Sequence, residues 1–267
     1  MKKIEIKRLV LFLLFSTYFF IGNTQTPTTH KLQMGIVLSS GLNFNKMNTK
    51  LADGSIGSDL TIGMNIIKNW NDNLGILTGF EFDFSRHNYY FQDTAYYSFT
   101  DSKILSKNDV ESTSTITFRM TDRKQTPIYL SIPTMFVFRT DYVGHNQFFA
   151  KFGMRHSFVL KSMTNDKGFE NQNVNRTSLT RMELSKDLSI YRGSIGISGG
   201  MEWNYYGTSR MVFELGYYYG INNIHRGDAI IGDVDKNKSI YENMAKTSFT
   251  TLKNTQNQLS IKVSFLF

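Results

Sequence analysis

Apolar and polar residues alternate along most of the chain, with the two-residue period of a β-strand. In the last segment, Leu259, Ile261 and Val263 alternate with Ser260 and Lys262. A strand with this pattern turns one set of side chains to each face of a sheet. The alternation predicts eight strands, over residues 32–44, 60–66, 74–84, 128–138, 148–160, 191–203, 211–221 and 259–267.

Most of these segments are longer than ordinary strands. A strand in a soluble protein averages about 5–6 residues, whereas a tilted membrane strand needs about 9–11. The length and the even number favour an all-β fold: a closed antiparallel up-and-down transmembrane β-barrel of eight strands. Residues 112–120 and 247–252, which are rich in Thr and Ser, either extend these strands above the membrane or add a ninth and a tenth.

The links between the predicted strands alternate in length. Short links cover residues 71–73, 141–147 and 205–209. Transmembrane barrels have short periplasmic turns and long external loops. We therefore expect both ends of the mature chain on the periplasmic side, with external loops over residues 46–56, 91–125, 162–187 and 222–256.

The N-terminal residues follow the order of a secretory signal peptide. Four basic residues within residues 1–8 precede an apolar run from Leu9 to Ile21. A membrane-anchor helix is the less favoured alternative, because spanning a bilayer takes about 20 apolar residues. Cleavage near Thr24 predicts a signal peptide over residues 1–24 and an outer-membrane β-barrel domain over residues 25–267.

The composition narrows the function classes. A mean hydropathy of −0.29 argues against helical membrane spans but not against barrel strands, which average apolar and polar positions. The absence of cysteine excludes disulfides and thiolate metal sites. Residues 1–24 hold four of the 30 basic and one of the 22 acidic residues, so the positive excess falls from eight to five without them. Since no dense basic run occurs, nucleic acid is not an expected partner.

Charged residues at the polar strand positions predict a network inside the barrel. An eight-stranded barrel is just wide enough for side chains to fill it, and a lone charge is costly to bury. A salt-bridged plug is the favoured interpretation, and a small polar pore or a proton-linked site is the alternative. We expect Glu214 to contact Lys262, and Lys151 to contact Glu202. The predicted inward charges are Glu81, Asp83, Lys151, Arg155, Arg192, Glu202, Glu214 and Lys262.

Aromatic residues gather at the ends of the predicted strands, where they would anchor a barrel at the membrane interfaces. Tyr89, Tyr90, Tyr96 and Tyr97 lie near or above the external interface. The aromatic residues that flank the short turns, and so mark the periplasmic interface, are Trp70, Tyr142, Trp203, Tyr205 and Tyr206.

Catalytic chemistry has little support in the sequence. None of the five histidines stands at metal-ligand spacing to another. His156 and Ser157 are adjacent, but neighbours on a strand point to opposite faces, so they form no dyad. No nucleophile elbow, phosphate loop or HExxH motif occurs. We expect no enzyme activity, no metal and no cofactor.

Several stretches resemble the PorT-like outer-membrane β-barrel family of Bacteroidota. Residues 129–138, YLSIPTMFVF, resemble its fourth strand, and residues 148–153, FFAKFG, its fifth. Residues 213–224 are similar to its Gly- and Asn-containing segment, and residues 260–267 to its closing strand. The resemblance implies an eight-stranded barrel whose biochemical role is mostly unassigned. PorT itself is linked to gliding and type IX secretion.

Single residues qualify this resemblance. Ser131 stands where the family commonly has Glu, and Tyr217 stands near a common Arg-Tyr. Phe267 resembles the terminal aromatic signal that barrel-assembly machinery reads. Pro133 has no N–H for a strand ladder and predicts a local bulge.

The leading hypothesis is an integral outer-membrane barrel, with a plugged polar lumen and a structural or binding role. Its expected partners are outer-membrane lipid, the barrel-assembly machinery and proteins at the external loops. The alternatives are a narrow channel, an accessory component of a protein secretion or cell-surface assembly system, and a soluble periplasmic β-sandwich.

Overall fold

A computed structural model describes nine ranges of the 267-residue chain, from residue 31 onward. The predicted signal peptide and its cleavage site lie outside the described residues. Among the residues that are described, no helix is long and apolar enough to cross a membrane. The ranges are 31–48, 52–98, 103–104, 117–170, 176–206, 209–226, 230–232, 249–251 and 253–267.

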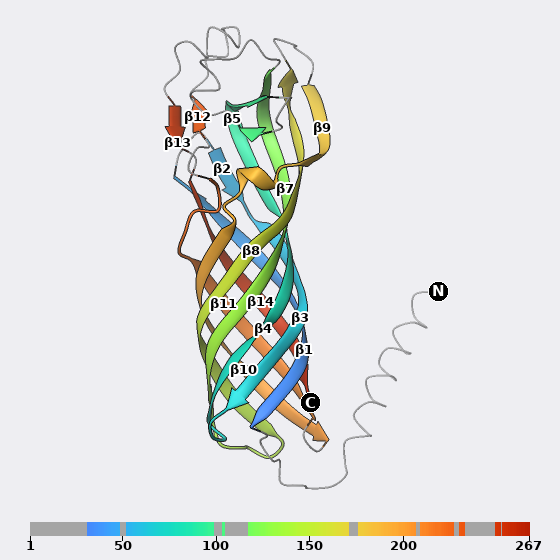
Figure 1. Ribbon diagram of the computed structural model, residues 1–267, viewed down its shortest axis with the longest axis vertical. Helices are drawn as coiled ribbons and strands as arrows, with labels where there is room; N and C mark the ends of the chain where they lie inside the picture. The colour runs from blue at the N-terminus through green and yellow to red at the C-terminus, as the bar shows by residue number, and fades with distance from the viewer. Residues whose placement is uncertain are drawn as a thin grey trace, which may run out of the picture.

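Eight antiparallel strands close into a ring, which is the lower part of the elongated molecule in Figure 1. Each pairs with the next along the chain, and β1 pairs with β14 from Gly35 opposite Leu266 to Met47 opposite Asn254. This closure confirms the predicted up-and-down barrel and excludes two stacked sheets. In ring order the strands are β1 (Leu32–Met47), β3 (Gly57–Asn69), β4 (Leu74–Ser85), β7 (Thr117–Arg139), β8 (Asn146–Glu170), β10 (Tyr191–Tyr206), β11 (Ser209–Gly220) and β14 (Asn254–Leu266).

The ring has its apolar side chains outside and its polar side chains inside. Burial alternates residue by residue along β1, β4, β11 and β14. This distribution of side chains is the reverse of that in a soluble protein. It is the one expected for a barrel surrounded by lipid. Exposed apolar side chains on every ring strand include Ile36, Ile62, Phe82, Phe136, Phe152, Ile197, Leu215 and Ile261.

At one end of the ring, here called the turn end, short links join β3 to β4 and β7 to β8, and Tyr206 of β10 pairs with Ser209 of β11. In the first, the Asn71 carboxamide oxygen accepts the backbone N–H groups of Asn73 and Leu74. In the second, Gly144 takes a positive φ of 64°, which glycine adopts without strain. The terminal residue Phe267 lies at this end too, where its backbone N–H and C=O bond to Met34.

The opposite end, here called the loop end, carries a β-sheet that rises beyond the ring (Figure 1). Strands β7 and β8 run for 23 and 25 residues and are joined along their upper halves by shorter strands. β5 (His87–Ser98) pairs with β7, β2 (Ala52–Ser55) and β6 (Lys103–Ile104) pair with β5, and β9 (Arg176–Glu183) pairs with β8.

The predicted additional strands therefore do not join the ring. The described part of residues 112–120 belongs to β7, whose extension above the ring confirms one of the two expectations. Within residues 247–252, β13 (Phe249–Thr251) pairs with β12 (Ile230–Gly232) in a separate sheet. A ten-stranded barrel is thus wrong.

Pro133 does not produce the expected bulge. The register between β4 and β7 is the same on either side of it, at Thr78–Thr134 and at Glu81–Ser131. The register shift in this part of β7 lies at Ile128 and Tyr129, on the side that faces β8.

Two segments at the loop end, residues 184–189 and 222–226, bond to each other and to β8 and β14 and are here called the cap. It contains the short 3₁₀ turn η1 (Ser185–Asp187). Leu188 forms an isolated bridge with His225, and the Ser189 N–H donates to the Ile224 C=O. Leu184, Leu188 and Ile224 are buried beneath these contacts.

Candidate functional site in the barrel lumen

The eight charged residues of the predicted lumen network all lie on ring strands, and all are buried. Buried charges need partners, because desolvation of a lone charge is costly. Their contacts divide into a central network and a turn-end cluster. A third group, at the loop end, consists of residues that the sequence did not single out.

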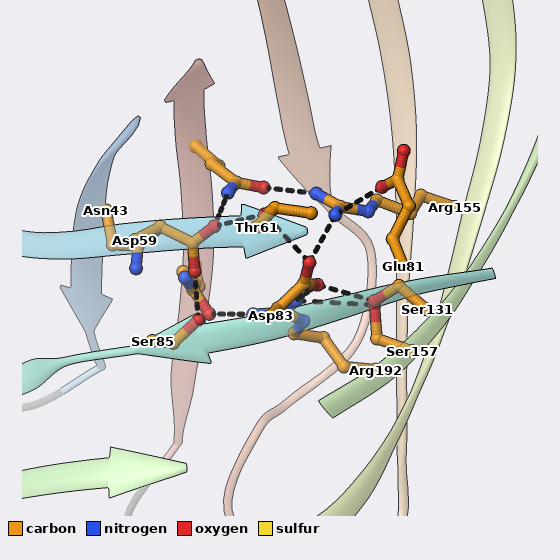
Figure 2. Close-up of polar contacts among 12 residues, drawn as sticks. Asn43, Asp59, Thr61, Glu81, Asp83, Ser85, Ser131, Arg155, Ser157 and Arg192 are labelled. Carbon is orange, nitrogen blue, oxygen red and sulfur yellow. Dashed lines mark hydrogen bonds and ion pairs between the residues drawn. The ribbon is translucent and has the colours of Figure 1, made fainter. Parts of the chain in front are cut away.

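The central network is organised around Arg155 of β8, which reaches across the lumen to β4 (Figure 2). Its Nη2 lies 2.6 Å from Glu81 Oε2 and 2.5 Å from Asp83 Oδ1. Arg192 Nη2 lies 3.3 Å from Asp83, and Lys262 Nζ lies 3.2 Å from Glu81. Three cations from β8, β10 and β14 thus converge on two carboxylates of β4.

Neutral groups complete the coordination of these carboxylates. The Ser131 hydroxyl donates to Asp83 and lies 2.6 Å from the Ser157 hydroxyl. The Thr61 hydroxyl lies 2.9 Å from Asp83 and 3.0 Å from Asp59 (Figure 2). The network therefore spans β3, β4, β7 and β8 without a gap.

Asp59 is a member of this network that sequence reasoning missed. Its carboxylate accepts hydrogen bonds from Ser85 and from Gln258 Nε2, the latter at 2.6 Å. The predicted second strand began at residue 60, one position too late to include it. Every second side chain of this strand points inward, and that alternation includes both Asp59 and Thr61. Extending the predicted strand by one residue along this alternation would have found Asp59.

Lys151 contacts Glu214 and not Glu202. The Lys151 Nζ lies 2.5 Å from Glu214 Oε2, although β10 runs between their strands. Glu214 stands opposite Lys262 in the register, as expected, but the Lys262 ammonium bonds to Glu81.

Glu202 belongs instead to the turn-end cluster. Its carboxylate lies 2.8 Å from Arg139 Nε and 2.9 Å from Arg210 Nη1. Arg139 also donates to Asn69, whose carboxamide donates to Gln33. Neither arginine was predicted, because both lie at the edges of predicted strands.

The loop-end cluster joins the cap to the wall. Arg123 of β7 forms two hydrogen bonds with Asp166 of β8, at 3.0 and 2.8 Å, and a third with Asp187 of η1 at 2.9 Å. All three side chains are buried. The sequence placed them in loops, so this cluster was missed. Burial raises the pKa of Asp166, and the adjacent guanidinium opposes that effect.

Two buried histidines lie near the cap. The His225 ring lies tilted against the Tyr89 ring, with 5.4 Å between their centroids, and His87 Nδ1 lies 3.2 Å from Asn45 Oδ1. The pKa of each histidine is lowered to about 3, mainly by burial. The charge of Arg192 contributes to this lowering at His87, and that of Arg123 contributes at His225. Both imidazoles are therefore neutral at physiological pH.

The structure separates the only adjacent His–Ser pair considered for catalysis. Ser157 points into the lumen. His156 is half-buried on the outside, where its Nδ1 lies 2.9 Å from the Tyr191 hydroxyl. Within the described ranges, no cluster of three or more His, Asp or Glu side chains could hold a metal ion.

The predicted interface aromatics divide into two groups. Trp70 and Tyr205 are exposed at the turn end, and Trp203 is half-buried beside Tyr205. Tyr142 is half-buried and lies 5.6 Å from the Arg210 guanidinium, so it contacts the turn-end cluster. Tyr89 is buried at the loop end and does not face a membrane interface. The side chains of Tyr96, Tyr97 and Tyr206 lie outside the described residues.

A closed ring with an apolar exterior and an ion-paired interior defines the class of this protein as a transmembrane β-barrel. The family model described as "Outer membrane protein beta-barrel domain" matches residues 23–226, and the chain belongs to that family. The protein is thus a bacterial outer-membrane barrel.

Comparisons with solved structures give similar folds at low identity. Ail, the attachment invasion locus protein of Yersinia pestis, is 10% identical, with a TM-score of 0.37 over 89% of this chain and 100% of that one. OprG from Pseudomonas aeruginosa is 9% identical, with a TM-score of 0.39 over 92% of this chain and 99% of that one. Comparison with curated proteins gives no match.

Proposed function

We propose that this protein is a non-conducting outer-membrane barrel that holds the loop-end sheet outside the cell, where that sheet binds partners. The observation that carries the proposal is the central network, in which ion pairs from Arg155, Arg192 and Lys262 cross the lumen to β4. An ion that entered the lumen would have to displace these charge-assisted hydrogen bonds. Such bonds are about twice as strong as neutral ones.

Charge balance supports a plug over a selective pore. The central network and the Lys151–Glu214 pair together contain four carboxylates, Asp59, Glu81, Asp83 and Glu214, and four cations, Lys151, Arg155, Arg192 and Lys262. A pore that selects ions presents a ring of one sign of charge. A balanced set neutralises itself and has no such preference.

The length of the loop-end sheet supports a binding role. β7 and β8 continue well past the ring and carry β5 and β9 on their outer edges. A strand that only crosses the membrane needs about 9–11 residues, so much of this sheet serves another purpose. The sequence resemblance to PorT-like barrels favours partners from a protein secretion or cell-surface assembly system.

Planar-bilayer recording tests the plug directly. The purified wild-type barrel should give no stable conductance steps at neutral pH, and regular steps would contradict the proposal. Orientation is tested separately by labelling single introduced cysteines, because the natural chain has none. In intact cells a membrane-impermeant maleimide should label Lys167→Cys at the loop end and not Asp72→Cys at the turn end.

A narrow channel is the second candidate function, and a separate observation favours it. Between the central network and the cap, several buried polar atoms have no hydrogen-bond partner in the structure, on Gln125, Tyr129, Ser162, Thr164 and Gln256. Leaving such a group unpaired costs about 1–3 kcal/mol, so water is expected to occupy this level. A channel would still require the cap to open. In that case Asp187→Asn, which weakens the bond from Arg123 to η1, should produce conductance that the wild type lacks.

A further inference from the structure

At the loop end, two pairs of basic residues follow the last lipid-facing apolar residues of the ring strands. Both pairs have the same arrangement. On β1 the last exposed apolar residue is Phe44, and the next outward position is Lys46, opposite Thr255 of β14. One level higher, the Asn48 N–H donates to the C=O of Lys253. Lys46 and Lys253 are therefore diagonal neighbours on the outer face.

The second pair repeats this order on the other side of β3. Phe84 of β4 stands opposite Ile128 of β7, and the next outward position on the β4 side is Arg86. One level higher, Asn88 stands opposite Lys124. Both arrangements thus place a cation after the last apolar level and a second cation diagonally above it. Diagonal neighbours across antiparallel strands are about 7–8 Å apart.

These four cations have no carboxylate partner among the described residues. Lys46, Arg86, Lys124 and Lys253 are all exposed, and none of them takes part in the ion pairs of the structure. Lys161, also exposed at the loop end, differs because it pairs with Glu183 at 3.8 Å. The four are therefore available to an anion supplied from outside the chain.

We propose that Lys46 with Lys253, and Arg86 with Lys124, each bind a phosphate group of an outer-leaflet lipid. Two long, flexible cations at this spacing can converge on one phosphate, and charge-assisted hydrogen bonds to phosphate are among the strong ones. The four cations lie at the height expected for lipid phosphates. They directly follow the apolar belt of the barrel, where acyl chains end and head groups begin. A lipid held there has its chains against Phe44 or Phe84 and its phosphate on the cations.

A soluble polyanion fits less well. The nearby acidic residues Asp53 and Asp122 lie one level further from the membrane, both opposite Tyr90. They would repel a polyanion that approached from the aqueous side, while leaving the membrane side open.

Binding of lipid A, a glycolipid with two phosphates, tests the inference. The folded wild type in zwitterionic detergent is titrated with lipid A and followed by native mass spectrometry. Removing a cation should weaken binding roughly fivefold, so Lys46→Gln/Lys253→Gln and Arg86→Gln/Lys124→Gln should each weaken one of the two sites roughly 25-fold and leave one tightly bound lipid A in place of two. Dephosphorylated lipid A should bind the wild type as weakly as lipid A binds the fourfold variant.

Matched variants make the result specific. Lys161→Gln removes a paired loop-end lysine, and Lys68→Gln removes an exposed lysine at the turn end of β3. Neither should change lipid A affinity by more than about twofold, and Lys46→Arg/Lys253→Arg should retain binding. The inference is overturned if the controls lose as much affinity as the pairs, if dephosphorylated lipid A binds equally well, or if heparin competes more strongly than lipid A.

The choice of leaflet rests on the proposed orientation, whereas the titration in detergent does not. Maleimide labelling of Asp72→Cys, and not of Lys167→Cys, in intact cells would overturn the orientation and the outer-leaflet assignment together. Loss of phosphate-dependent binding would overturn the site alone.

Discussion

Lys151 on β8 pairs with Glu214 on β11 by reaching past the intervening strand β10. The register explains this reach. Lys151 stands opposite Ser198, and Glu214 stands opposite Gly200. These two small residues leave room for the ammonium and the carboxylate to meet over the β10 backbone, so the pair depends on three strands at once.

We predict that breaking this pair on one side destabilises the barrel more than removing both partners. Lys151→Met leaves the Glu214 charge buried, and Glu214→Leu leaves the Lys151 charge buried, each at a cost of about 3–5 kcal/mol. The double variant should recover most of that loss. Urea unfolding in lipid vesicles, monitored by the fluorescence of Trp70 and Trp203, measures the three free energies. Strictly additive losses would show that the two charges do not interact.

Emptying the central network should open the lumen. Replacing Glu81, Asp83, Arg155 and Lys262 together by serine removes four long side chains and leaves the network's net charge unchanged. In the Asp187→Asn background, in which the bond from Arg123 to the cap is weakened, we expect stable conductance steps in planar bilayers, which Asp187→Asn alone and the wild type should lack or show only at a lower level. Thr78→Ser/Thr134→Ser, on the outer face, is the control for changes at the same strand level. A silent fourfold variant that still shows heat-modifiable migration would mean that another part of the lumen blocks passage.

The cap should loosen as the medium becomes acidic. His87 and His225 have folded-state pKa values of about 3, below the ordinary value of about 6.5. Protons therefore bind the unfolded state first, and stability falls as pH drops from 6.5 towards 3. At pH 5 the expected loss is about 2 kcal/mol for each histidine. Hydrogen exchange of residues 184–189, corrected for intrinsic rates, should rise between pH 7 and pH 5.

Replacing each histidine by phenylalanine provides the control for this pH dependence. His225→Phe keeps an aromatic ring against Tyr89 but cannot be protonated, so exchange in the cap should depend less on pH. An unchanged dependence in the His87→Phe/His225→Phe variant would assign the effect to other groups.

Two adjacent glycines on β10 should respond differently to alanine. A methyl group at Gly200 would collide with the Phe213 carbonyl and the Glu214 backbone. At Gly199 it would meet the Phe149 carbonyl at an ordinary 3.5 Å. Gly200→Ala should therefore lower the urea midpoint clearly, while Gly199→Ala should leave it nearly unchanged. Equal effects would show that intrinsic strand preference, and not the close approach of β11, controls this position.

The alternation of apolar and polar residues predicted the ring because each ring strand has one face towards lipid and the other towards the polar lumen. Residues 74–84 and 211–221 were placed to within two residues of β4 and β11, since lipid selects apolar side chains at every second position. The same alternation placed Glu81 and Arg155 on the inner face. It could not predict β5 and β9 in the long loops, where no lipid imposes a regular pattern.

The sequence by itself determined the two-faced strands and the short and long links, because these depend on local periodicity and turn length, whereas the structure decided between eight and ten strands. Only the tertiary structure decided which charges meet. Strands in a closed barrel are staggered, so Lys151 faces Ser198 and reaches Glu214, while Glu202 meets Arg139 and Arg210. Which charged side chains form ion pairs follows from that stagger and from side-chain length across the lumen. The order of residues along one strand determines neither the stagger nor the distance across the lumen.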